Sequence, residues 1–97
     1  MSSREHILEL LRQAKSDVEG QYHVRTMALF GSYSRNEQTE DSDVDLLVDF
    51  DEPISGLTFV RFADTLEERL GLHVDVVPAD AVKPRYRQHI QKDLVYV

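Results

Sequence analysis

Apolar side chains recur every three or four residues over two stretches of the chain, and each stretch is followed by a glycine. The first stretch runs from about Arg4 to Glu19 before Gly20, and the second from Leu57 to Leu70 before Gly71. Such spacing places the apolar side chains on one face of a helix, and glycine is common just after a helix ends. The pattern predicts two long amphipathic helices.

Three shorter apolar segments are typical of strands. They are Val24–Phe30, Val44–Phe50 and His73–Val77. The second is a nearly continuous apolar run that closes at charged residues and a proline, which is typical of a central strand covered on both faces. We therefore expect three strands, with the second in the middle of the sheet.

The C-terminal part of the chain predicts two further elements. Pro78 should end the third strand, and a short helix should begin after Pro84, since proline suits the first helical position. Tyr86 and Ile90 are expected to face inward from that helix. Residues 94–97 form a last extended segment.

The order of these elements predicts the topology of the sheet. A helix joins the second and third strands, which favours a parallel pair, whereas the connection between the first and second can return antiparallel. The expected fold class is therefore α/β (α+β): a small mixed sheet of three or four strands flanked by helices. At 97 residues the chain is expected to form one domain over residues 1–97.

In such a sheet, polar residues from three strands meet at one edge. Gly31 and Ser32 follow the first strand, Asp43 and Asp45 open the second, and Asp75 lies near the start of the third. Asp43 and Asp45 share a face because side chains alternate along a strand. Carboxylates about 4 Å apart repel by about 4 kcal/mol at an effective dielectric near 20, so a compensating cation is expected.

Composition narrows the function classes. Eleven Lys and Arg residues against 18 Asp and Glu residues give a net charge of −7, which opposes charge-driven binding to nucleic acid. The chain has no Cys, no apolar run long enough to span a membrane, and no secretory signal pattern at its start. We expect a cytoplasmic protein that binds neither membranes nor nucleic acid directly.

Two explanations of the carboxylates involve no nucleotide. The spacing from Asp41 to Glu52 follows the ligand positions of an EF-hand calcium loop, but Leu46 stands where that loop needs Gly. A solvated acidic turn would explain one Asp pair. It explains Asp75 less well, because Val74 and Val76 flank it in an apolar strand and an unpaired buried carboxylate is costly.

A third explanation is a divalent cation bound together with a nucleoside triphosphate. Mg²⁺ prefers carboxylate oxygens and completes its coordination with substrate phosphates. Gly31 and Ser32 can supply backbone N–H groups and a hydroxyl to those phosphates, and Gly31 permits close approach.

The motifs also carry a family resemblance. Gly31–Arg35 reads GSYSR, Ser42–Val48 reads SDVDLLV, and Val74–Val77 reads VDVV. Together they resemble the polymerase-beta-type nucleotidyltransferase superfamily, and most closely its minimal nucleotidyltransferase (MNT) proteins, the antitoxins of HEPN ribonuclease toxins. The resemblance covers most of the chain, including the tail AVKPRYRQHIQKDLVYV. Ser34 and Asn36 replace the Ala and Gly usual in that family, and Asn tolerates the positive φ that the turn requires.

The resemblance implies roles for the carboxylates and the turn. Asp43 and Asp45 would hold two Mg²⁺ ions, and Asp75 would complete the ion nearer the attacking hydroxyl. Gly31 and Ser32 would bind the β and γ phosphates of ATP.

The sequence allows two interpretations for each of three further features, which are Arg35, Tyr33 and the basic residues near the C-terminus. Arg35 would either clamp a phosphate or form a salt bridge to Glu37 or Asp41, and Tyr33 would stack on a base or cover the turn. Five basic residues near the C-terminus would form a solvated helix face or approach a partner. They are Lys83, Arg85, Arg87, His89 and Lys92.

The function implied by the resemblance is transfer of AMP from ATP to a hydroxyl of a protein. The expected acceptor is a tyrosine of a cognate HEPN ribonuclease toxin, which would make the chain an antitoxin. The alternative is a non-catalytic binding module that neutralises its partner by docking alone.

Overall fold

The computed structural model describes residues 3–97 and contains one four-stranded mixed sheet. Its strands are β1 (Val24–Phe30), β2 (Val44–Phe50), β3 (Val74–Pro78) and β4 (Val95–Tyr96). They lie in the order β3-β2-β1-β4. β2 runs antiparallel to β1 and parallel to β3, and β4 runs antiparallel to β1. The predicted fold class and the strand directions are confirmed.

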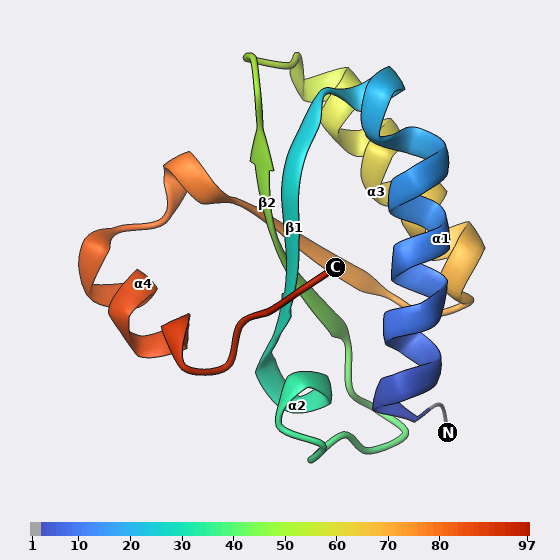
Figure 1. Cartoon of the computed structure of the whole chain (residues 1–97), viewed down its shortest axis with the longest axis vertical. Coiled ribbons are helices and arrows are strands. Elements are labelled where there is room, and N and C mark those ends of the chain that lie inside the picture. The colour runs from blue at the N-terminus through green and yellow to red at the C-terminus, as the bar shows by residue number, and fades with distance from the viewer. Residues whose placement is uncertain (1–2) are drawn as a thin grey trace.

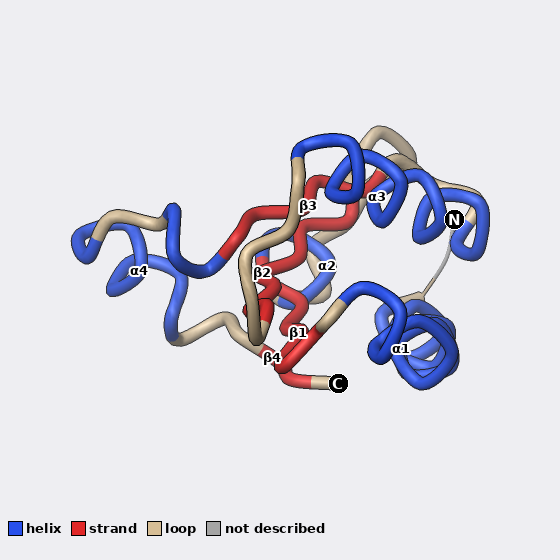
Figure 2. Tube along the Cα trace, turned by 90° about the horizontal axis from the view of Figure 1, so that it is seen from above, coloured by secondary structure: helices blue, strands red, loops and turns tan. Residues whose placement is uncertain are grey.

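The two long helices pack on the same face of the sheet. They are α1 (Arg4–Tyr22) and α3 (Gly56–Leu70). Figure 1 shows them side by side, and Figure 2 shows both on one side of the sheet with α4 (Pro84–Gln91) on the other. Aromatic side chains join the layers, because the Phe62 ring lies 5.3 Å from Tyr22 and 5.5 Å from Phe50. None of the helices within residues 3–97 is long and apolar enough to cross a membrane.

The strands sort their side chains onto two unlike faces. Val44, Leu46 and Val48 belong to the main core beneath α1 and α3. Leu47 instead joins a small cluster with Phe30 and Ile90 of α4 on the opposite face. Because side chains alternate along a strand, Asp45 and Asp75 share this second face, which α4 covers only thinly.

The end of the first helix differs from the prediction. α1 continues past Gly20 to Tyr22, and His23 ends it in the left-handed conformation with φ 59°, its N–H donating to the Glu19 carbonyl. The buried Tyr22 ring packs on Phe62, which keeps the chain helical for two more residues. The second predicted stop is confirmed, since Gly71 follows α3 with φ 67°.

Two details of the C-terminal half also differ. β3 begins at Val74 and includes Pro78, which is tolerated because β3 is an edge strand whose outer N–H positions need no partner. Tyr86 does not face inward: it is 47% exposed, and Ile90 is the buried residue of α4. α4 has only about two turns and packs on the sheet mainly through Ile90, so its other side chains, including Tyr86, face solvent.

Phe62 provides a test of the core that carries the sheet. It is fully buried between two aromatic rings, so Phe62→Ala should lower the free energy of unfolding by about 3–5 kcal/mol. Val60→Ala in the same helix is the matched control, because Val60 is 54% exposed and its loss should cost no more than about 0.5 kcal/mol. Urea unfolding followed by circular dichroism measures both. Equal losses would contradict the assignment of the core.

Candidate nucleotide and metal site

The strand register places the predicted site residues at one edge of the sheet. Phe30 pairs with Asp45 across β1 and β2, and Asp45 pairs with Asp75 across β2 and β3. Gly31 follows Phe30 directly, and Asp43 lies one residue before β2. The structure therefore brings together the three carboxylates and the Gly-Ser turn, which are far apart in the sequence.

Asp45 lies at the electrostatic centre of this edge. Partial burial raises the pKa of its carboxyl group, and the neighbouring Asp75 and Asp43 raise it further, while Arg35 and His73 act in the opposite direction. Burial and the two neighbouring carboxylates therefore both disfavour the ionised form of Asp45. Its oxygens, with those of its two neighbours, form a donor set of the kind that Mg²⁺ prefers.

Asp75 does not occupy the buried position that its apolar neighbours suggested. Its side chain is 64% exposed and lies 4.0 Å from His73, which in turn pairs with Glu67 at 2.6 Å. At Asp75 the second face of the sheet is therefore open to solvent. The desolvation cost of a carboxylate therefore applies to Asp45 and not to Asp75. The exposed Asp75 side chain is accessible to a second molecule.

The Gly-Ser turn is a short helix, α2 (Gly31–Ser34), that begins directly after β1. Gly31 has φ 78°, and a Cβ at this position would collide with Oδ2 of Asp45. The turn and the carboxylate can therefore approach each other only because residue 31 has no side chain. The first N–H groups of a helix have no intrahelical acceptor, so this end of α2 suits phosphate oxygens.

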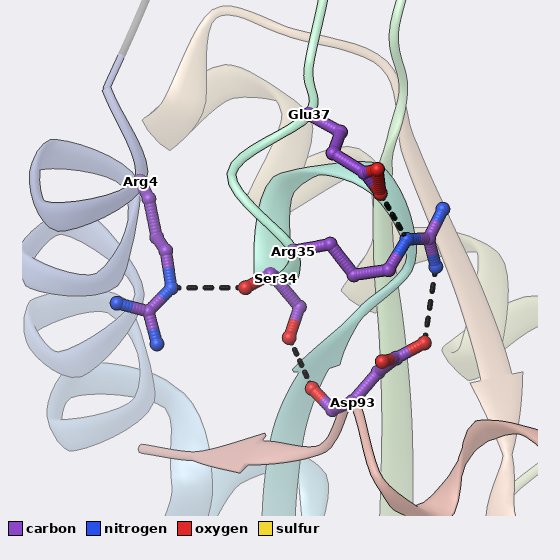
Figure 3. A network of polar contacts seen from close by, with 5 residues as sticks. All are labelled: Arg4, Ser34, Arg35, Glu37 and Asp93. Atoms are coloured by element: carbon purple, nitrogen blue, oxygen red, sulfur yellow. Dashed lines mark hydrogen bonds and ion pairs between the residues drawn. The ribbon is translucent and has the colours of Figure 1, made fainter.

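The residues after the turn are tied to other parts of the chain (Figure 3). The Arg35 guanidinium lies 2.7 Å from Glu37 and 3.0 Å from Asp93, and these hydrogen bonds raise its pKa. The expected salt bridge to Glu37 is confirmed, and Asp93 takes the place suggested for Asp41. A role for Arg35 in binding phosphate stays a prediction. Asn36 has φ 60°, as its tolerance of the left-handed region suggested.

Two earlier alternatives are resolved by burial and secondary structure. Tyr33 is only 2% exposed and belongs to the main core, so it covers the turn and does not stack on a base. The segment from Asp41 to Glu52 contains strand β2, so it cannot form the loop of an EF-hand.

A second group of ligand-type side chains was missed by the sequence analysis. His23, Asp51 and Glu52 place donor atoms within 4.8 Å of one another. Within residues 3–97, which the structure describes, the donor atoms of Asp43, Asp45 and Asp75 do not all lie that close together. The group lies where β1 begins and β2 ends, which is the opposite end of the sheet from Gly31. Antiparallel pairing of the two predicted strands would have located it, since the pairing sets residue 24 beside residue 50.

The family is decided by comparison with known proteins. A nucleotidyltransferase domain model matches residues 8–97. The chain belongs to the nucleotidyltransferase domain family. It is 40% identical over 97 residues to "Protein adenylyltransferase MntA" of Thermococcus cleftensis, covering 100% of this chain and 98% of that one. This nucleotidyltransferase domain also resembles a solved minimal nucleotidyltransferase structure, with TM-score 0.81 and 33% identity over 97% of this chain and 95% of the other. The resemblance to minimal nucleotidyltransferases is confirmed.

Two more distant structures share the fold. One is a toxin–antitoxin crystal structure with AMP-PNP, with TM-score 0.69 and 24% identity over 82% of this chain and 63% of that chain. The other is a tri-AMPylated HEPN toxin from Shewanella oneidensis in complex with an MNT antitoxin, with TM-score 0.61 and 22% identity over 96% of this chain and 66% of that chain. At these identities the likeness concerns the fold alone.

The contact between Gly31 and Asp45 can be tested by adding one methyl group. Gly31→Ala should destabilise the nucleotidyltransferase domain by about 1–3 kcal/mol, because it combines a positive φ with the collision at Asp45. Gly20→Ala is the control: a Cβ there meets nothing within 4 Å, and in a helix the change should stabilise by about 0.5–1 kcal/mol. Thermal unfolding of both variants checks the opposite signs. A Gly31→Ala variant as stable as wild type would contradict the close approach.

The raised pKa of Asp45 predicts a pH-dependent cost in the metal-free protein. Because folding disfavours the ionised carboxylate, stability falls as pH rises from the ordinary Asp value of 3.8 through the raised one, and the loss is complete above it. Asp45→Asn removes this cost. In EDTA at pH 7 the variant should melt about 2–6 °C above wild type, and the difference should vanish below about pH 4.

Asp41→Asn is the control for this substitution, because Asp41 is an exposed carboxylate in the preceding loop. Its melting temperature should stay within about 2 °C of wild type. If Asp45→Asn instead melted below wild type at pH 7, the electrostatic account of the site would be wrong.

Proposed function

We propose that this nucleotidyltransferase domain transfers AMP from ATP to a hydroxyl of a protein, with Mg²⁺ as cofactor. The observation that carries the proposal is the row formed by Gly31, Asp45 and Asp75, in which a partly buried carboxylate lies between the Gly-Ser turn and an exposed carboxylate. The names of its homologues support protein adenylylation as the reaction class. AMP-PNP in a structure of the same fold supports ATP as the donor.

The three carboxylates offer the oxygen ligands that Mg²⁺ prefers. Asp43 and Asp45 would hold two Mg²⁺ ions, and Asp75 would complete the coordination of one of them. When bound, Mg²⁺ lowers the pKa of the attacking hydroxyl and neutralises the charge of the triphosphate. The raised pKa of Asp45 supports this assignment, because a carboxylate that is costly to ionise without a cation gains most from one.

In this proposal the Gly-Ser turn binds the triphosphate of ATP, and the acceptor hydroxyl approaches beside the exposed Asp75 of the edge strand β3. Gly31 and Ser32 would bind the β and γ phosphates. The acceptor oxygen forms a new bond to the α phosphorus while the bond to pyrophosphate breaks, and the hydroxyl proton passes to solvent. Exposure of Asp75 leaves room for a macromolecular acceptor, as this reaction requires.

The proposed partner is a HEPN ribonuclease toxin, and the proposed acceptor is one of its tyrosines. A complex of an MNT antitoxin with a tri-AMPylated HEPN toxin, which shares the fold, supports the pairing. A nucleotide adds bulk and negative charge where RNA phosphates must approach, so modification would block the ribonuclease. We accordingly place the protein in the cytoplasm as an antitoxin.

The mass of a co-expressed HEPN toxin tests the proposal. With wild-type chain the toxin should carry AMP adducts and stay inactive after the chain is removed, whereas the Asp43→Asn, Asp45→Asn double variant should give unmodified, active toxin. Intact-mass spectrometry and a ribonuclease assay on the purified toxin measure both.

Docking alone is the competing account, and the same samples discriminate it. A pull-down with the double variant establishes that the partner still binds. If the toxin is unmodified in both samples and yet fully inhibited while bound, the chain neutralises its partner without catalysis and the proposed transfer is wrong.

A further inference from the structure

The C-terminal segment of the chain reaches back to the proposed phosphate-binding turn through Asp93 (Figure 3). Asp93 Oδ2 lies 3.0 Å from Nη1 of Arg35, and the Asp93 backbone carbonyl accepts a hydrogen bond from the Ser34 hydroxyl. One residue therefore makes a side-chain contact and a backbone contact with two consecutive residues of the turn region. These contacts join positions 58 and 59 residues apart.

Asp93 is itself held firmly. Its N–H donates to the carbonyl of Ile90, the buried residue of α4, at 2.9 Å. Two residues further on, Val95 pairs with Leu29 in the sheet. The carboxylate is thus fixed between a helix end and a strand, and its side chain is only 13% exposed.

The two carboxylates on Arg35 are not equivalent. The Glu37 side chain is 61% exposed and lies two residues along the chain, whereas Asp93 is nearly buried and belongs to a distant segment. Arg35 itself is 44% exposed, so neither ion pair is fully shielded, but only the pair with Asp93 joins the turn to a distant segment that is anchored by its own backbone contacts. Asp93 is therefore the partner that can hold Arg35, and with it the turn, in a defined place.

The turn is also held from the other side. Nε of Arg4, in the first turn of α1, donates to the Ser34 carbonyl at 3.1 Å. Ser34 is therefore hydrogen-bonded through its carbonyl to the N-terminal helix and through its hydroxyl to the C-terminal segment. Arg35 remains close enough to Asp45 to oppose the rise of that pKa, so the tie also keeps a cation beside the acidic edge.

We propose that Asp93 is a positioning residue for the phosphate-binding turn, acting through Arg35 to fix the turn beside Asp45. This inference rests on the proposed function, namely that the turn binds the phosphates of ATP. Asp93 contacts neither nucleotide nor metal in this account. Its loss lets the turn move, so that the N–H groups of Gly31 and Ser32 are no longer held where the phosphates arrive.

Binding of Mg²⁺·AMP-PNP, measured by isothermal titration calorimetry, tests the inference. Asp93→Asn should raise the Kd about tenfold, because the charge-assisted bond that ties Arg35 to the anchored C-terminal segment is lost while the backbone acceptor remains. Glu37→Gln removes the exposed carboxylate from the same guanidinium and is the matched control, with an expected change below about threefold. Equal affinities of wild type and Asp93→Asn would overturn the role of Asp93.

A double-mutant cycle with Arg35→Gln distinguishes positioning from a general loss of structure. If Asp93 acts through Arg35, Asp93→Asn should weaken binding less than about twofold further in the Arg35→Gln background. A tenfold loss in both backgrounds would mean that Asp93 acts independently, and would overturn the inference.

Two further outcomes are decided by the same set of proteins. If Asp93→Asn alone does not fold, the double variant removes both charges of the Arg35–Asp93 pair and leaves only the exposed Glu37 without its cation, and wild-type affinity in it would overturn the inference. If wild-type protein binds no Mg²⁺·AMP-PNP at all, the proposed function fails, and the role of Asp93 fails with it. If wild-type protein binds Mg²⁺·AMP-PNP and Asp93→Asn binds it equally well, only the role of Asp93 is wrong, and the proposed function stands.

Discussion

The site depends on one constraint: strand β2 pairs with β1 in antiparallel register and with β3 in parallel register at the same residue, Asp45. The first pairing sets the end of β1, with Gly31, beside Asp45. The second sets the start of β3, with Asp75, on its other side. The absence of a side chain at Gly31 then lets the turn close on the carboxylate. A slip of β2 by one residue would turn Asp45 toward the core and disrupt the site.

Much of this arrangement could be predicted because it follows from periodicity. The apolar run of β2 and the helical spacing of α3 fixed a parallel crossover, and parallel strands start at the same edge. The period of two along a strand predicted that Asp43 and Asp45 share a face. Gly31 directly after a predicted strand indicated the turn. The residue type of Asn36 alone indicated that it tolerates a positive φ.

The remainder depended on tertiary contacts that no local pattern encodes. The sequence left open whether Tyr33 stacks on a base or covers the turn, and only its burial in the main core decides between the two. Asp75 looked buried among valines, yet β3 is an edge strand with one open face. The tie between Arg35 and Asp93 joins residues 58 positions apart, and charge pairing at that separation cannot be read from spacing.

The central claim is that the edge with Gly31, Asp45 and Asp75 binds the metal and the triphosphate, and paramagnetic broadening by Mn²⁺ tests it directly. Asp45 lies five residues along β2 from Phe50, so roughly 17 Å separate this edge from the group of His23, Asp51 and Glu52. In ¹H–¹⁵N spectra with AMP-PNP and substoichiometric Mn²⁺, amides of Gly31, Asp45 and Asp75 should broaden first. Broadening centred on His23 and Asp51, with those three amides unaffected, would contradict the account.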